Sequence, residues 1–320
     1  MHQRAHAASD SAAATLSGYR QEIVAGLTEP QKRLAPKHLY DERGSELFDT
    51  ICSLPEYYPT RTEVGLLRTH GAEIAALVGP HADVVELGAG SSLKARLLLD
   101  CLEHPASYSP VDISAEYLAR QAAEVAQAYR HVTVRPVLAD FTRPFVLPPG
   151  VASQRAVVFF PGSTIGNLSR AQAAALLAAL AERTRGGSLL IGVDICKDAA
   201  LLRPAYNDSL GVTAAFNRNV LVRLNRELEA DFDLDSFEHD AVYDPLHSRI
   251  EMRLVSQRAQ VVTVAGIDIV FRKGEYIVSE HSHKYAPQEF AAMARTAGWH
   301  FGRCWIDAET RFSVHYFRAP

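Results

Sequence analysis

Short apolar runs alternate with longer amphipathic runs between residues 83 and 195, and this alternation constrains the fold more than any other feature of the chain. The apolar runs are rich in β-branched and aromatic residues and occupy 83–87, 108–113, 132–140, 155–160 and 187–195. Strands that alternate with helices form βαβ units, whose strands lie parallel in one sheet. We therefore predict an α/β fold with a parallel sheet.

The alternation stops near residue 196. Residues 198–228 have the spacing of helices, and strand patterns follow at 248–257, 259–266, 267–274 and 275–283. A helix pattern at 286–299 precedes two last strand patterns, 300–307 and 311–319, which are joined by a short connection. Such a short connection predicts an antiparallel hairpin at the C-terminal end of the sheet.

This order predicts a domain of residues 62–196 and 286–320, interrupted by an α+β insertion. We expect the insertion to pack with the N-terminal segment, so that 16–61 and 197–285 form a second domain for substrate binding. Residues 16–28 are predicted to be a helix, and the small, polar residues 1–15 a flexible tail. Thr60 and Glu63 have the spacing of a capping box, which predicts that the next helix begins there.

Composition argues against several classes of protein. The formal net charge is −4 with no Lys/Arg-rich block, which argues against a nucleic-acid-binding protein. No apolar run approaches the ~20 residues of a membrane span, and the first residues lack the apolar core of a signal peptide. The four cysteines are scattered without metal-ligand spacing, so we expect no metal site, free thiols and a cytoplasmic protein.

A glycine-rich turn and acidic residues follow the predicted strands. Gly88 lies directly after the first strand, where glycine allows a tight turn and a close approach to a ligand. Asp112 ends the second strand, where an acid commonly binds ribose hydroxyls. Asp140 and Phe141 end the third, where an acid can accept from an exocyclic amine and an aromatic ring can lie against a purine. The alternative is a plain turn, with Asp112 and Asp140 capping the helices or turns that follow.

These features distinguish between two nucleoside ligands. A dinucleotide fingerprint needs a third glycine where this chain has Leu93, and the final hairpin does not suit a dehydrogenase. Glu86, the two glycines, Asp112 and the Asp140–Phe141 pair together resemble class I S-adenosylmethionine (SAM)-dependent methyltransferases, although Ser92 replaces the last glycine of their common pattern. Their Rossmann-like, seven-strand sheet also ends in an antiparallel hairpin, so the resemblance implies an α/β fold of this kind.

Two polar stretches are candidates for substrate binding. The loop 161–167 (PGSTIGN) offers backbone N–H groups, hydroxyls and the amide of Asn167, a set that suits a small zwitterion. The alternative is that Asn167 caps the helix after it. In the strand 275–283, Glu280 and Ser282 face one side while His281 and His283 face the other. This alternation argues against a metal site and favours a carboxylate and a hydroxyl that together hold a polar ring.

Four longer motifs carry a closer resemblance. The stretches 40–63, 162–170, 203–208 and 279–285 resemble, in this order, the histidine-specific methyltransferases of ergothioneine biosynthesis. That family converts L-histidine to its Nα-trimethyl betaine, hercynine, in three methyl transfers from SAM, which leaves as S-adenosylhomocysteine. The resemblance implies a class I methyltransferase with L-histidine as its small-molecule partner, and we expect a monomer that binds neither nucleic acid nor membrane.

The resemblance also implies roles for individual residues. The cofactor would be bound by Gly88, Lys94, Asp112, Asp140 and Phe141, under a segment that contains Tyr40. The amine and carboxylate of histidine would be held by Tyr57, Asn167 and Tyr206, of which Tyr57 and Asn167 are the catalytic candidates. The imidazole would be bound by Glu280 and Ser282 against Met252. The amine pocket would be lined by Phe48, Gly162 and Thr164.

Three alternatives remain at this point. One is a related N-methyltransferase that acts on tryptophan or another aromatic amino acid, which an apolar residue in place of Glu280 would favour. Another is a non-catalytic SAM-binding protein, which a blocked substrate loop would favour. The third is an NAD-linked oxidoreductase, which Leu93 and the C-terminal hairpin disfavour.

Overall fold

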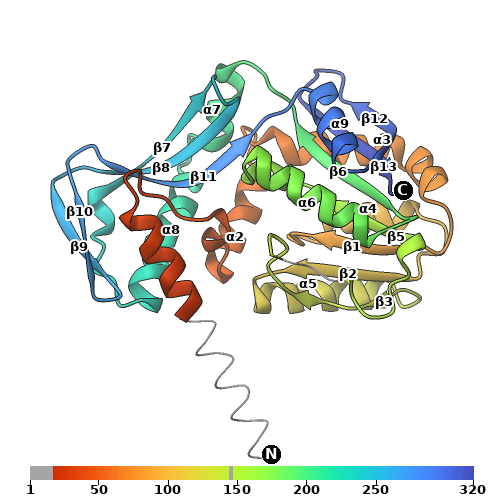
Figure 1. Ribbon diagram of the computed structural model, residues 1–320, viewed down its shortest axis with the longest axis horizontal. Helices are drawn as coiled ribbons and strands as arrows, with labels where there is room; N and C mark the ends of the chain where they lie inside the picture. The colour runs from red at the N-terminus through yellow and green to blue at the C-terminus, as the bar shows by residue number, and fades with distance from the viewer. Residues whose placement is uncertain (1–16, 144–146) are drawn as a thin grey trace, which may run out of the picture.

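The computed structural model describes residues 17–143 and 147–320, so the predicted tail 1–15 lies outside the described residues. Two parts lie side by side: a large sheet with its helices at the right of Figure 1, and a smaller sheet with its helices at the left. β11 (Tyr276–His283) runs from the smaller sheet toward the larger one, and the next residues return the chain to the large sheet, where Tyr285 pairs with Ile195.

The large sheet has the predicted Rossmann-like pattern. Its order is β12-β13-β6-β5-β1-β2-β3, and β4 also pairs with β2. The strands from β3 to β6 in this order are parallel, whereas β13 is antiparallel to both β6 and β12, which confirms the C-terminal hairpin. The strand bounds are β1 Asp83–Leu87, β2 Ser107–Asp112, β3 Thr133–Val134, β4 Val137–Leu138, β5 Ala156–Phe160, β6 Ser188–Asp194, β12 His300–Ile306 and β13 Phe312–Arg318.

One strand prediction is wrong in detail. Residues 132–140 form two short strands, β3 and β4, where one strand was expected. Pro136 lies between them, and because proline has no N–H it cannot donate to the neighbouring strand. Both short strands nevertheless pair in parallel with β2, so Asp140 still follows the carboxyl end of this edge of the sheet.

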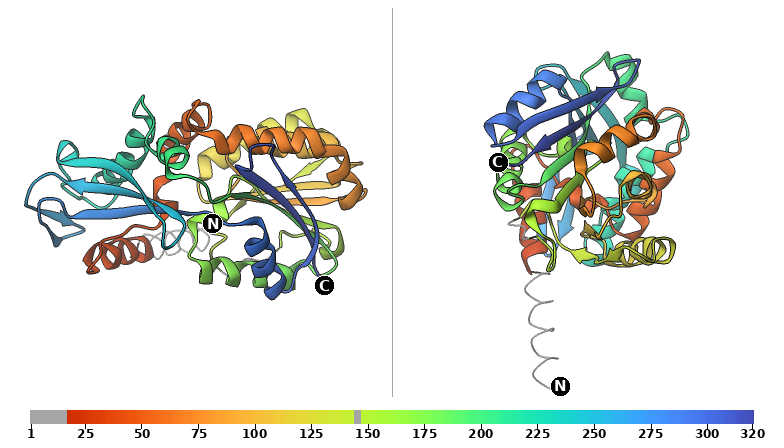
Figure 2. Two further views of the ribbon diagram at one scale, coloured as in Figure 1. Left: turned by 90° about the horizontal axis from the view of Figure 1, so that it is seen from above. Right: turned by 90° about the vertical axis from the view of Figure 1, so that its right-hand side faces the viewer.

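Helices cover both faces of the large sheet, as Figure 2 shows from two further directions. One hydrophobic cluster joins the strands to α3 (Tyr58–Val78), α4 (Leu93–Cys101) and α5 (Ala115–Ala128). A second joins them to α6 (Arg170–Arg183) and α9 (Pro287–Thr296). Short 3₁₀ helices lie at η2 Ser153–Arg155 and η3 Thr164–Asn167. The large sheet is therefore the middle of three layers.

The smaller part combines the two ends of the predicted second domain. It contains a helix over 17–28 and a three-stranded antiparallel sheet in the order β11-β8-β7, beside a hairpin of β9 and β10. The remaining bounds are η1 Pro36–Leu39, α2 Glu42–Cys52, α7 Ala199–Tyr206, α8 Val212–Glu227, η4 Leu234–Ser236, β7 Phe237–Asp244, β8 Arg249–Ser256, β9 Gln260–Val264 and β10 Ile267–Phe271. The sequence analysis did not predict α2 or β7.

A single hydrophobic cluster holds these segments together. Ile23, Leu39 and Ile51 from the N-terminal segment share it with Val220 and Met252 from the insertion. The expected domain boundaries at residues 61–62, 196–197 and 285–286 stay our proposal. Among the described residues, no helix combines the length and the apolar character needed to cross a membrane.

Candidate active site

Three predicted cofactor and substrate segments meet at the carboxyl ends of the parallel strands. Gly88 follows β1 with a φ of +70°, a left-handed conformation that favours glycine, and its N–H donates to Val111 of β2. A Cβ built on Gly88 would lie 3.6 Å from the Phe141 ring and 3.6 Å from the methyl group of Thr164. The structure thus brings together Gly88, Phe141 and Thr164, which the sequence placed after three different strands.

Asp112 has one carboxylate oxygen available for a ligand. Its Oδ1 accepts from the Ser114 backbone N–H at 2.9 Å, whereas Oδ2 accepts no hydrogen bond from any residue that the structure describes. Burial raises the pKa of Asp112 to about 6, and the hydrogen bond from the Ser114 N–H opposes this rise. The turn expected under the capping alternative is therefore present, and the remaining oxygen fits a ribose hydroxyl.

Asp140 is tied to its own turn and to the N-terminal segment. Its Oδ1 accepts from the Thr142 N–H at 3.0 Å, and its Oδ2 lies 3.0 Å from the ammonium of Lys37 in η1. Burial raises the pKa of Asp140, but Thr142 and Lys37 outweigh it and hold the pKa below its usual value. Oδ1 also accepts from the Thr142 hydroxyl, so the lone pair left for an exocyclic amine is on Oδ2. Lys37 also joins the segment that contains Tyr40 to the cofactor edge.

A buried carboxylate that the sequence analysis missed lies between the cofactor and substrate segments. Glu63 of α3 accepts from the Lys94 ammonium at 2.7 Å and from the Gly162 N–H at 2.9 Å. The capping-box prediction for Glu63 is wrong, because α3 begins at Tyr58 with Pro59 in its first turn and so already encloses residues 60–63. The carboxylate instead points toward the sheet, where a Cβ on Gly192 would lie 2.0 Å from its Oε1.

The loop after β5 points the amide of Asn167 toward the smaller sheet. The capping alternative for Asn167 is wrong, because Ser169 caps α6 and forms a capping box with Gln172. Asn167 Nδ2 instead lies 3.5 Å from Oε2 of Glu280. The loop therefore connects the strand-end edge of the large sheet with the strand that carries Glu280.

Glu280 lies on the face of β11 that the alternation predicts. It pairs with Met252 of β8 across the sheet, so both side chains lie on one face, and Glu280 is only 6% exposed. Burial raises its pKa to about 7, and the charge of Lys284 opposes this rise. His281 lies on the other face, 3.3 Å from Glu251, which agrees with the predicted alternation. Among the residues described, no cluster of His, Cys, Asp and Glu could hold a metal ion.

Ser282 and Tyr206 come together beside Glu280. Their hydroxyl oxygens are 2.8 Å apart, although one residue belongs to β11 and the other ends α7. Both also accept hydrogen bonds from Lys284, at 2.8 Å and 2.7 Å respectively. The sequence analysis missed Lys284 and its ion-pair partner Asp194, although Lys284 lies within the quoted stretch 279–285.

Aromatic side chains form a wall of the site. The ring of Phe48 lies 5.5 Å from that of Tyr40 and 6.0 Å from that of Tyr57, and the rings of Tyr57 and Tyr206 are 6.2 Å apart. Burial raises the pKa of Tyr40 and Tyr57 well above their ordinary values. Both phenols are therefore neutral near pH 7 and can donate hydrogen bonds.

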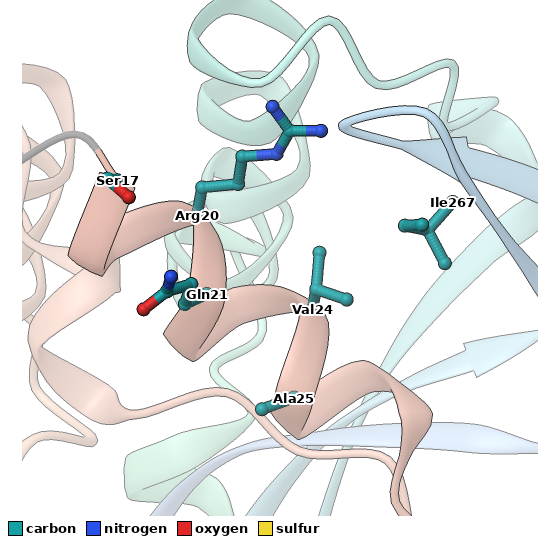
Figure 3. Close-up of a pocket in the computed structure, with 6 residues that line it drawn as sticks. All are labelled: Ser17, Arg20, Gln21, Val24, Ala25 and Ile267. Carbon is teal, nitrogen blue, oxygen red and sulfur yellow. The ribbon is translucent and has the colours of Figure 1, made fainter.

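A hollow on the surface of the smaller part is separate from this site. Figure 3 shows that it lies between the helix 17–28 and β10, and it is lined by Ser17, Arg20, Gln21, Val24, Ala25 and Ile267. None of these residues belongs to the group that meets at the strand ends. The converging polar groups, and not this hollow, mark the candidate active site.

Comparison with known proteins gives the family. Residues 19–319 match the model of a family described as histidine-specific, SAM-dependent methyltransferases. A histidine N-alpha-methyltransferase of Mycolicibacterium smegmatis is 45% identical over 313 residues, which are 96% of this chain and 96% of that protein. The protein of the same name from Mycobacterium tuberculosis is 45% identical over 303 residues, 92% of this chain and 93% of that protein.

A more distant relative has a different substrate in its name. A 4-dimethylallyltryptophan N-methyltransferase of Claviceps purpurea is 27% identical, and the match covers 90% of this chain and 91% of that protein. The family model, however, spans nearly the whole chain, and both mycobacterial proteins match over nearly their full lengths. The chain therefore belongs to the family of SAM-dependent, histidine-specific methyltransferases.

Proposed function

We propose that the protein transfers three methyl groups in succession from SAM to the α-amino nitrogen of L-histidine. The product is hercynine, the precursor of ergothioneine, and each transfer releases one S-adenosylhomocysteine. The similarity to two histidine N-alpha-methyltransferases supports this assignment.

The buried carboxylate of Glu280 is the observation that carries the choice of substrate. Within the described chain its only side-chain hydrogen-bond contact is the 3.5 Å approach of Asn167. A buried carboxylate without full hydrogen bonding is costly, so this position favours a ligand with ring N–H groups. Tryptophan offers a single ring N–H on a larger ring, whereas imidazole offers two nitrogens that Glu280 and Ser282 can each contact.

The cofactor side fits SAM. The free oxygen of Asp112 suits the ribose, and the ring of Phe141 beside Gly88 suits the adenine. When bound, SAM supplies a methyl group on a positively charged sulfur, which is already activated for transfer. The protein has to hold the amine nitrogen in line with that methyl group at about 3–3.5 Å, and the loop 161–167 with Asn167 is placed for this role.

The amine must be neutral before it reacts. The nitrogen lone pair forms the new N–C bond, the C–S bond breaks, and its electron pair returns to sulfur. Primary and secondary amines must then lose a proton, whereas the third transfer leaves a quaternary nitrogen with no proton. Since burial keeps Tyr57 protonated near pH 7, we propose that Tyr57 orients the amine and passes its proton on through hydrogen bonds, without acting as a strong base.

We further propose a cytoplasmic monomer whose partners are small molecules. All four cysteines are free thiols in the structure, which suits a reducing compartment. Gel filtration with light scattering at working concentration tests the monomer: a mass near 35.1 kDa is expected, and twice that mass would exclude it.

An end-point assay by mass spectrometry tests the reaction. The purified protein is mixed with SAM and an equimolar mixture of the twenty amino acids. Histidine that gains three methyl groups, with no other amino acid changed, is the expected result. Methylated tryptophan or tyrosine would contradict the histidine pocket while keeping the cofactor. Bound SAM without methylation of any amino acid would contradict the proposed substrate class.

A further inference from the structure

Lys284 is a fully buried lysine directly after β11, with a side chain 0% exposed. Its ammonium contacts Asp194 Oδ2 at 2.7 Å, the Tyr206 hydroxyl at 2.7 Å and the Ser282 hydroxyl at 2.8 Å. An ammonium has three donors and no acceptor, so these contacts use all of its hydrogen-bonding capacity. Lys284 therefore holds other side chains in place and has no donor left for a ligand.

Asp194 keeps Lys284 charged. Burial opposes the ammonium, but the Asp194 carboxylate outweighs it and raises the pKa of Lys284 above its ordinary value. The same carboxylate lies 2.6 Å from Lys197, and there burial prevails and lowers the pKa to about 8. Lys197 donates to Tyr58 and to Asp194, but it makes no contact with Tyr206 or Ser282.

The two hydroxyls act as one unit. Tyr206 and Ser282 are 2.8 Å apart, so one donates to the other, and both accept from Lys284. Because lysine only donates, neither hydroxyl proton is used on Lys284. One proton lies in the mutual bond and the other is available to a ligand. The pair therefore offers a ligand one O–H donor, and the hydroxyl oxygens can also accept a hydrogen bond.

We propose that Lys284 is a positioning residue for histidine binding: anchored on Asp194, it holds the hydroxyls of Tyr206 and Ser282 at a fixed separation. The Tyr206 hydroxyl then forms a hydrogen bond with the carboxylate of the substrate, and the Ser282 hydroxyl forms one with its imidazole ring. This role rests on the proposed function, since it requires an amino acid with a polar ring in the pocket. Side chains locked by a second layer of hydrogen bonds bind with less loss of entropy than mobile ones.

Lys284→Met tests this role, because methionine is similar in length but donates no hydrogen bond. Asp194 keeps Lys197 as a partner in this variant. We expect the KM for histidine to rise about 10- to 100-fold, as for the loss of hydrogen bonds from a charged group, while kcat at saturating histidine and the KM for SAM change less than about threefold. If the KM for histidine stays within about threefold of wild type, or the KM for SAM rises equally, the positioning role is wrong.

Lys197→Met is the matched control, because it removes an ammonium from the same carboxylate without touching the hydroxyl pair. Its KM for histidine should change less than about threefold. An equal rise of the KM for histidine in Lys284→Met and Lys197→Met would assign the effect to Asp194 alone and would contradict the role of Lys284. If Lys284→Met does not yield folded protein, Lys284→Gln, which keeps one donor group, provides the same comparison with the same criteria.

The pH profile gives a readout that a purely structural role would not move. Among the described residues, the ionisable groups that interact electrostatically with Glu280 are Tyr40, Tyr57, Tyr206 and Lys284, and of these Lys284 is the one charged near pH 7. Removing this charge should raise the pKa of Glu280 further and shift the acid limb of kcat/KM for histidine to higher pH. An unshifted limb in Lys284→Met would contradict the proposal.

The two possible failures can be told apart. If the wild-type protein does not methylate histidine, the proposed function fails. If the wild type methylates histidine and Lys284→Met keeps its KM and its pH profile, only the role of Lys284 fails.

Discussion

The cofactor edge and the histidine pocket stabilise their carboxylates in different ways. At the cofactor edge, Asp112 and Asp140 each accept a hydrogen bond from a backbone N–H two residues later in the chain. In the pocket, Glu280 is approached by Asn167, 113 residues away in the sequence, at 3.5 Å. The turn hydrogen bonds of the first arrangement are local, although Asp140 also pairs with Lys37 of the N-terminal segment. The contact of Glu280 exists only when the two parts of the molecule are assembled.

This difference separates two ways of preparing a binding site. At the cofactor edge the turns supply hydrogen bonds before any ligand arrives, although burial still raises the pKa of Asp112 to about 6, so the ligand adds to groups that are already hydrogen-bonded. Glu280 is buried with an incomplete set of partners, so the protein carries an energetic cost that a ring N–H can relieve. Selectivity should therefore be concentrated in the pocket, and the predictions below test this contrast in order of decreasing effect.

Glu280→Ala should have the largest effect. We expect kcat/KM for histidine to fall about 10⁴- to 10⁵-fold, because a site built for a polar ring loses its acceptor, and we expect methylation of phenylalanine or tryptophan to become detectable. Steady-state kinetics with product detection by mass spectrometry measures both. Glu251→Gln is the control, since Glu251 faces the other side of the sheet, and it should change kcat/KM less than about threefold. Wild-type kinetics in Glu280→Ala would remove Glu280 from the pocket.

Glu280→Gln tests the energetic cost directly. Burial raises the pKa of Glu280 from 4.5 to about 7, so folding favours the protonated form, and the stability it gives at low pH is lost as the pH rises through 7. At about 1.36 kcal/mol per pKa unit, the ionised carboxylate costs as much as about 3 kcal/mol at pH 8. Denaturant unfolding without ligand should show glutamine more stable than wild type at pH 8, with the gain nearly absent at pH 4. An equal difference at both values would contradict this account.

Asp112→Asn tests the other region. The amide oxygen can still accept from the Ser114 N–H, so the turn should persist, while the charged acceptor for the ribose is lost. We expect SAM to bind about 10- to 100-fold more weakly by calorimetry, in keeping with a hydrogen bond to a charged group. The KM for histidine at saturating SAM should stay near the wild-type value. A comparable rise in both constants would show that the two regions are not independent.

Tyr57→Phe should have the smallest effect on the chemistry. If Tyr57 orients the amine and is not a strong base, the deficit should shrink to less than about tenfold at pH 9, where more of the amine is already neutral. Initial rates from pH 7 to 9 at saturating histidine measure this. Complete loss of activity across the whole range would make Tyr57 an obligatory base.

Much of the fold could be predicted because its signals are local. The β-branched runs and the helical spacing between residues 83 and 195 specified the parallel sheet, and the last two strand patterns specified the hairpin. β7 was missed because charged residues such as Glu238 and Asp240 occupy its exposed face and interrupt any apolar run. The strand expected at 132–140 is divided at Pro136, because proline has no N–H to donate to the neighbouring strand.

The sequence suggested members for the candidate site but could not give their contacts. Glu63 had a sequence pattern that suggested a helix cap, yet its carboxylate accepts from Lys94 and Gly162, which belong to other segments. No spacing in the sequence distinguishes a lysine on the surface from one buried against Asp194, so Lys284 gave no signal.

By itself the sequence therefore determined the fold class, the order of the elements and the residue types available at the strand ends, because periodicity and turn chemistry act over a few residues. Only the tertiary structure decided which carboxylate meets which ammonium and that Tyr206 and Ser282 share one lysine. It also decided that, within the described part of the chain, the one side-chain hydrogen bond to Glu280 is the 3.5 Å approach of Asn167. These pairings depend on burial and on segments far apart in the chain, and local patterns carry no information about either.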